Sequence, residues 1–221
     1  GRLAHGDAAR PVEFSVPTGN FGDIFAGYVA KRMGLPMGKL LLATNRNDIL
    51  TRFFSTGNYR IGQAHPTISP SMDIQVSSNF ERYLYYLLHE DPVAVGKKMA
   101  ELDTTGGFQV PRTVIDAAGE FRATAVGEEE TVTTIRTVYE RYGYLLDPHT
   151  AVGFAAAKNR PGMVCLATAH PAKFGDAVKQ AIGREPKRPP LLDGLEQRPH
   201  RCQVMAASVQ AVRDFIAGQL G

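Results

Sequence analysis

The run Thr18-Gly19-Asn20-Phe21-Gly22-Asp23 has the composition of an anion-binding turn. Its two glycines let the backbone turn tightly and approach a ligand without interference from a Cβ atom. A helical pattern follows, so free amides at the helix start and the helix dipole favour an anion. The run has neither the Gly-Lys-Ser/Thr of a P-loop nor the spacing of a dinucleotide turn. Because Asp23 opposes an anion, spacing alone supports a phosphate site and a plain tight turn equally.

Two other segments carry polar side chains that could bind a ligand. Thr168 ends a predicted strand, at the edge where open parallel sheets bind ligands. Ser77, Ser78 and Asn79 stand where a predicted helix begins, and they could bind a second anion. These residues alone favour simpler interpretations. Thr168 would satisfy a local backbone group, and Ser78 would form a capping box with Glu81.

The histidines do not predict a metal site or a catalytic triad. His65, His149 and His170 lie far apart in the sequence, each next to a proline. No His-x-x-x-His or Cys-x-x-Cys spacing occurs, and no Gly-x-Ser-x-Gly elbow is present. We therefore expect no metal, and we interpret the histidines as turn residues, with His149 the one candidate for a role in a site.

The elements that must position these residues follow from hydrophobic periodicity. Residues 12–16 alternate as a strand, residues 24–33 have helical spacing that ends before Gly34, and residues 39–43 form a short apolar strand. Strand, helix and strand in about thirty residues form a βαβ unit, which implies a parallel sheet. Further helices are predicted at 49–54, 79–89, 128–142, 147–158, 171–182 and 204–217, a strand at 163–168, and weak pattern at 92–125. We predict one α/β domain over residues 1–221, an open and mostly parallel sheet flanked by helices.

Composition narrows the class of protein. The 221 residues are 43% hydrophobic and carry a net charge of +3, which argues against disorder and against nucleic acid as a partner. The basic cluster at 184–188 lies among prolines and is interpreted as a solvated loop. Two cysteines make no disulfide framework, which favours the cytoplasm, and no apolar run approaches the ~20 residues that span a membrane.

Five strings in order resemble the microbial type of threonine synthase, a pyridoxal-phosphate (PLP) lyase of amino-acid biosynthesis with the tryptophan-synthase-like fold, called fold type II. One such string is weak evidence, but five in the family's order are strong. They are SVPTGNFGD from Ser15, ISPSMDI from Ile68, SSNFER from Ser77, YLLDPHTAVG from Tyr144 and ATAHPAKF from Ala167.

The resemblance implies roles for the residues singled out above. Such enzymes convert O-phospho-L-homoserine and water to L-threonine and phosphate by elimination and replacement at Cβ and Cγ. The implied cofactor-binding residues are Gly19, Asn20, Phe21 and Gly22 at the phosphate and Thr168 at the pyridine nitrogen. A substrate phosphate needs a second site, and the candidates are Ser77, Ser78, Asn79, Arg82 and His149.

One departure from the family limits what the chain can do. The family's Schiff-base lysine stands in a Ser-Phe-Lys-Asp-like context of the N-terminal half, and none of the eight lysines here has it. We therefore expect a truncated C-terminal portion of the catalytic domain that holds no catalytic residue and is inactive alone. An exposed truncation surface would favour self-association. The alternatives are another fold type II lyase, such as a dehydratase, and a non-catalytic α/β anion-binding module.

Overall fold

The structure is a computed structural model, and it describes residues 11–220. The chain divides into two compact units, with the division between Lys187 and Arg188. This division lies in the proline-rich stretch 184–199 that the sequence predicts to be a loop. The prediction of a single domain over the whole chain stays a prediction.

The first unit is built on a parallel sheet. Strand β1 (Val12–Pro17), helix α2 (Gly22–Arg32) and strand β2 (Met37–Thr44) form the expected βαβ unit. The order of the sheet is β5-β2-β1-β6, with β5 (Phe121–Ala125) and β6 (Val164–Cys165) at its edges. All three pairings are parallel, which confirms the predicted fold class. Strand β6 has only two residues, so the predicted strand over 163–168 is too long.

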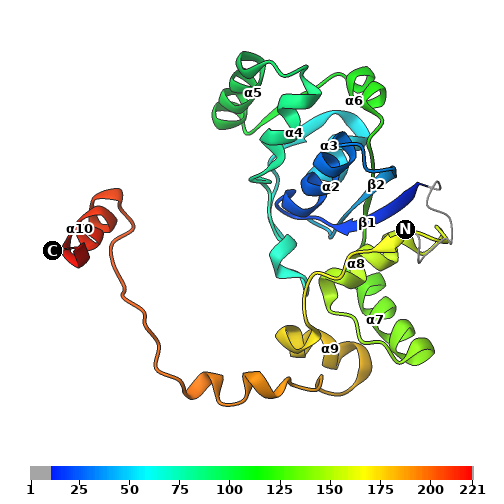
Figure 1. The fold of residues 1–221 in the computed structure, drawn as a ribbon, viewed down its shortest axis with the longest axis vertical. Helices are drawn as coiled ribbons and strands as arrows, with labels where there is room; N and C mark the ends of the chain where they lie inside the picture. The colour runs from blue at the N-terminus through cyan, green and yellow to red at the C-terminus, as the bar shows by residue number, and fades with distance from the viewer. Residues whose placement is uncertain (1–10, 221) are drawn as a thin grey trace. The chain divides into compact units, whose positions relative to one another are not determined.

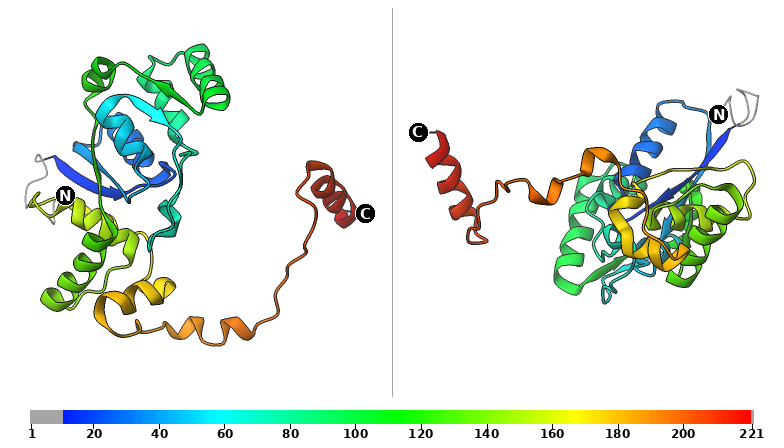
Figure 2. Two further views of the ribbon diagram at one scale, coloured as in Figure 1. Left: turned by 180° about the vertical axis from the view of Figure 1, so that it is seen from behind. Right: turned by 90° about the horizontal axis from the view of Figure 1, so that it is seen from below.

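Helices cover both faces of this sheet, as Figures 1 and 2 show. Leu40 and Leu42 point to the face packed by α2 and α3 (Ile49–Thr56), where most of the buried aromatic rings gather. Ala43 points to the opposite face, against Val152 of α8 (Pro148–Ala157). Helices α7 (Glu128–Tyr142) and α9 (Gly175–Ile182) pack behind α8. This alternation along β2 is what a strand buried on both faces requires.

The segment between β2 and α7 holds the predicted helix at 79–89, two helices in the weakly patterned stretch 92–125, and two short strands that the sequence did not predict. A small antiparallel sheet pairs β3 (Asn58–Arg60) with β4 (Gly107–Gln109). Around it lie α4 (Phe80–Leu87), α5 (Pro92–Thr105) and α6 (Arg112–Ala118). Each of the two strands has three residues, which is too short for an alternating pattern to be visible.

Short 3₁₀ turns complete the first unit, at Pro70–Met72 and at Pro171–Phe174 before α9. The second unit, from Arg188, holds two more such turns (Pro190–Leu192 and Leu195–Gln197) and α10 (Val209–Leu220). Within it Arg188 pairs with Glu196 at 2.6 Å. Helix α10 begins five residues later than the sequence predicts.

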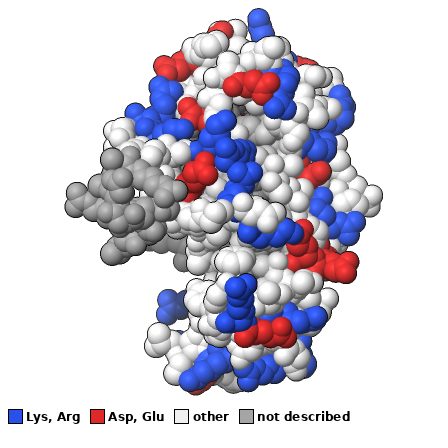
Figure 3. Space-filling model, turned by 90° about the vertical axis from the view of Figure 1, so that its right-hand side faces the viewer, with Lys and Arg blue, Asp and Glu red and all other residues white. Residues whose placement is uncertain are grey.

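Basic and acidic side chains are interspersed on the face shown in Figure 3. Ion pairs account for part of this mixture, for example Arg122 with Glu13 at 3.3 Å. Within residues 11–220, no helix combines the length and the apolar character that a membrane crossing requires.

Candidate functional site

The turn at the carboxyl end of β1 is shaped by Phe21. This residue precedes α2 with φ 70° and ψ 4°, a left-handed conformation that is costly for a residue with a side chain. Its ring is completely buried, with centroids 5.3 to 6.5 Å from the rings of Phe25, Phe54, Phe80, Tyr83 and Phe121. The buried ring anchors the strained backbone. Phe21 can therefore serve a ligand only through its main chain.

The turn presents backbone N–H groups that the protein leaves free. The side chain of Asn20 accepts the N–H of Gly22 at 2.9 Å. Within residues 11–220, no acceptor lies within hydrogen-bonding distance of the N–H groups of Gly19, Asn20 or Phe21. Three free donors at the start of an eleven-residue helix form an arrangement suited to a phosphate. Asp23 is exposed in the first turn of α2 and remains the one local charge that opposes an anion.

Gly19 lies against the 3₁₀ turn Pro70–Met72. A Cβ atom on Gly19 would be 2.9 Å from the carbonyl oxygen of Ser71 and 3.2 Å from Cα of Met72. Real side chains do not fit at such distances from backbone, so this position requires glycine. The segment around Ser71 is therefore part of the site, although the sequence suggested no role for it beyond its place in a resembling string.

Residues 77–79 support the same turn. Ser77 is buried, and its hydroxyl donates to the carbonyl of Gly19 at 2.9 Å. The N–H of Asn79 donates to the carbonyl of Asn20 at 3.0 Å. The structure thus brings together two segments that the sequence proposed as separate anion sites.

The predicted capping box at the start of α4 is wrong. Asn79, not Ser78, is the N-cap residue, and no side chain caps the helix. Ser78 is exposed, because the bonds to the turn at 19–20 fix its two neighbours and place the helix start one residue later. The guanidinium of Arg82 lies 4.4 Å from the ring centroid of Phe25 and donates to the Asn79 side chain at 3.2 Å.

His149 is held between two partners. Its Nδ1 lies 3.0 Å from Oδ1 of Asp147, and its Nε2 accepts the N–H of Ser71 at 3.2 Å. Both side chains are almost completely buried, and Phe174 covers the imidazole with centroids 4.6 Å apart. Burial by itself raises the pKa of Asp147, but hydrogen bonds from His149 and Thr150 outweigh it, so that this pKa lies below its ordinary value. Asp147 also caps α8 as predicted, accepting the N–H groups of His149 and Thr150.

Thr168 follows β6, at the same carboxyl end of the sheet as the turn after β1. Strands β6 and β1 are parallel neighbours, so the residues after each strand emerge on one side. The N–H of Thr168 donates to the hydroxyl of Thr150 at 3.0 Å. Its own hydroxyl has no partner within residues 11–220, and the residue is exposed. The threonine is therefore free to meet a ligand, rather than satisfying a backbone group.

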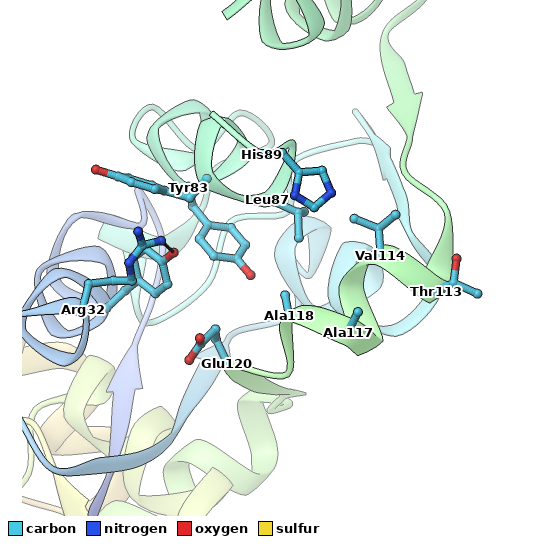
Figure 4. Close-up of a pocket in the computed structure, with 11 residues that line it drawn as sticks. Arg32, Tyr83, Leu87, His89, Thr113, Val114, Ala117, Ala118 and Glu120 are labelled. Atoms are coloured by element: carbon cyan, nitrogen blue, oxygen red, sulfur yellow. Dashed lines mark hydrogen bonds between the residues drawn. The ribbon is translucent and has the colours of Figure 1, made fainter. Parts of the chain in front are cut away.

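A separate cavity of about 410 Å³, whose lining residues are drawn in Figure 4, lies near the amino end of β5. It is lined by residues of α2, α4 and α6 and by Glu120, which precedes β5. Lys31 pairs with this carboxylate at 2.8 Å. None of the residues that the sequence proposed for binding lines this cavity.

The positions of the His, Cys, Asp, Glu and Lys side chains in the described residues bear on the expectations for metal ligands and for a reactive lysine. The chain from 11 to 220 contains no group of three His, Cys, Asp or Glu side chains placed to hold a metal ion. Four lysines pair with carboxylates: Lys31, Lys98, Lys158 and Lys179. Lys173 is exposed, with its ammonium 5.8 Å from the centroid of the Phe174 ring.

Comparisons with known proteins point to one family. A family model described as the C-terminal part of threonine synthase matches residues 150–216. Threonine synthase of Pseudomonas aeruginosa is 47% identical over 97% of this chain and 47% of the relative. That of Saccharomyces cerevisiae is 47% identical over 82% of this chain and 40% of the relative.

The fold comparison gives the same result. The crystal structure of PLP-bound threonine synthase from Brucella melitensis has a TM-score of 0.88 and 48% sequence identity, covering 98% of this chain and 48% of that one. The chain therefore spans about half the length of the relatives it matches. Over nearly all its length it is similar to the C-terminal half of these proteins, which confirms the resemblance drawn from the sequence strings.

Proposed function

We propose that this chain, which matches the C-terminal half of threonine synthases in sequence and fold, serves as that half of such an enzyme. The reaction is the conversion of O-phospho-L-homoserine and water to L-threonine and phosphate. The observation that carries the proposal is the turn at 18–22. Its three free N–H groups lie on a backbone packed against Ser71. They lie at the carboxyl end of the sheet, where the chain around Thr168 also emerges.

PLP suits this set of groups. The N–H groups of Gly19, Asn20 and Phe21 are donors for its phosphate, and the hydrogen bond from the N–H of Gly22 to the side chain of Asn20 keeps the turn in shape. The free hydroxyl of Thr168 is a neutral partner for the ring nitrogen, so it does not force that nitrogen to stay protonated. When bound, PLP supplies an electron sink for the carbanions of the reaction. The chain's own residues bind the phosphate and fix the position of the ring.

The substrate phosphate requires a second set of donors. We assign the exposed hydroxyl of Ser78 and the guanidinium of Arg82 to it, with Asn79 orienting the guanidinium. Ser77 and His149 contribute indirectly, since the hydroxyl of Ser77 holds Gly19 and both ring nitrogens of His149 are engaged.

We further propose that the Schiff-base lysine lies outside these 221 residues, so that this chain alone is inactive. No lysine of the sequence has the family's context, and four of the eight are engaged in ion pairs. A cytoplasmic location is proposed on the two free cysteines, Cys165 and Cys202. Self-association through the exposed truncation surface stays a prediction.

The test is an absorption titration of the chain with PLP, followed by borohydride reduction and peptide mapping. We expect no stoichiometric adduct and no phosphate release from O-phospho-L-homoserine. Stoichiometric labelling of one lysine, for example Lys173, would contradict the proposal for the missing lysine. Release of a 2-oxo acid from serine or threonine by the chain joined to its upstream half would favour a dehydratase. Binding of inorganic phosphate by a chain that does not bind PLP would favour the non-catalytic anion-binding module.

A further inference from the structure

The carboxylate of Asp147 has two oxygen atoms, and each one engages a different side chain. Oδ1 lies 3.0 Å from Nδ1 of His149. Oδ2 accepts a hydrogen bond from the hydroxyl of Thr150. Asp147 is 1% exposed, so water cannot replace either partner at low cost. One buried group therefore fixes two neighbouring side chains of α8.

The first branch leads from Asp147 to the phosphate-binding turn. Since Nε2 of His149 accepts the N–H of Ser71, the ring must carry its proton on Nδ1, which then donates to Asp147. The carbonyl of Ser71 in turn meets Gly19, where a Cβ atom would approach to 2.9 Å. The orientation of the imidazole thus bears on the position of the turn.

The second branch leads from Asp147 to Thr168, the residue proposed to meet the ring nitrogen. The hydroxyl of Thr150 has one proton, which goes to Oδ2 of Asp147, and its lone pairs remain for the N–H of Thr168. The residue is 5% exposed, so this bond is made in a dry environment. The donor of this bond is Thr168, whose free hydroxyl is the proposed contact with the ligand.

We propose that Asp147 is a positioning residue that sets the separation between the phosphate-binding turn and Thr168. It acts through His149 on one side and Thr150 on the other. A rigid ligand with a phosphate at one end and a ring nitrogen at the other binds well only when both contacts are preorganised at a fixed distance. The identity of that ligand rests on the proposed function, whereas the two-branched hydrogen-bonded clamp does not.

The test compares a ligand with two ends to a ligand with one. Pyridoxine 5′-phosphate has the phosphate and the ring nitrogen but no aldehyde, so it does not label surface lysines. Inorganic phosphate engages the turn alone. For Thr150→Val, we expect pyridoxine phosphate to bind about tenfold more weakly, a loss of about 1.4 kcal/mol in binding free energy, because the hydroxyl that connects Asp147 to the N–H of Thr168 is removed and Thr168 is no longer held in place. Phosphate affinity should stay within twofold, and Thr150→Ser should restore the tighter binding.

Amide hydrogen exchange without any ligand provides the second readout. Thr150→Val should reduce protection at Thr168 and spare Ser71, His149→Phe should do the reverse, and Asp147→Asn should reduce both. The amides of β2, in the centre of the sheet, report global unfolding and serve as the reference.

Two results would overturn the clamp. One is that the affinities for both ligands fall by the same factor in every variant, which indicates a general loosening of the fold. The other is uniform loss of protection, including β2. If wild-type protein binds phosphate but not pyridoxine phosphate, the proposed cofactor is wrong. The hydrogen-exchange pattern then still shows whether Asp147 positions both Ser71 and Thr168.

Discussion

The hydroxyl of Tyr59 accepts the backbone N–H of Ser77 at 2.8 Å, and both residues are buried. This bond joins the small β3–β4 sheet to the segment that supports the turn at 18–22, the proposed phosphate site. Tyr83 is equally buried, at 2% exposure, yet within the described residues its hydroxyl has no hydrogen-bond partner. Burial raises the pKa of both phenols. Tyr83, which lines the cavity shown in Figure 4, is therefore a control for what the bond between Tyr59 and Ser77 contributes.

Tyr59→Phe should lower the free energy of unfolding by about 1–3 kcal/mol, because it leaves a buried N–H group without an acceptor. Tyr83→Phe should leave it nearly unchanged, because no hydrogen bond is lost. Urea unfolding of both variants and the wild type measures the difference. Equal losses in the two variants would show that the bond to Ser77 does not stabilise the fold.

Gly19→Ala should weaken phosphate binding and destabilise the fold by about 1–3 kcal/mol, because the new methyl group overpacks the backbone of the segment around Ser71. Gly96→Ala is the control. No atom lies within 4 Å of a Cβ placed on Gly96, which lies in α5. An exposed helical glycine replaced by alanine should gain up to about 1 kcal/mol. Phosphate titration and urea unfolding measure both effects. Unchanged phosphate affinity in Gly19→Ala would contradict the proposal that the turn at 18–22 binds the phosphate.

Phe21→Ala should cost about 3–5 kcal/mol through the loss of a buried ring. Phe21→Gly should be more stable than Phe21→Ala by about 0.5–1 kcal/mol, since only glycine adopts the left-handed backbone without strain. At Phe25, inside α2, the order should reverse, with alanine better than glycine by about 1 kcal/mol. Chemical denaturation of the four variants provides the comparison, and the same order at both sites would contradict the assigned strain.

The stability that Asp147 provides should depend on pH. Its folded pKa lies below the ordinary value, so its contribution is complete above the ordinary Asp pKa, about 3.9, and is lost as the pH falls through the folded value. The difference in unfolding free energy between the wild type and Asp147→Asn should therefore be largest near neutral pH and shrink below about pH 4. Urea unfolding from pH 7 to pH 3 tests this, and a constant difference would refute the lowered pKa.

Much of the fold was predictable because strong local signals mark it. Alternation defines β1, helical spacing with Gly34 defines the end of α2, and Asp147-Pro148 defines the start of α8. The same signal, Asp91-Pro92, marks the start of α5, where Asp91 accepts the N–H groups of the two residues after Pro92. Strands β3 and β4 could not be found this way, because three-residue strands are stabilised by pairing across 49 residues and not by local pattern.

The sequence by itself identified residues 18–22 as a candidate anion-binding turn, because glycine flexibility and free amides at a helix start are local properties of these residues. Only the tertiary structure decided what surrounds that turn. Ser71 and His149 are 78 positions apart, and their hydrogen bond exists because the sheet order and the packing of α8 bring the two segments together. Spacing along the chain carries no information about such contacts. The positioning roles of Asp147 and Thr150 therefore became visible only in the folded arrangement.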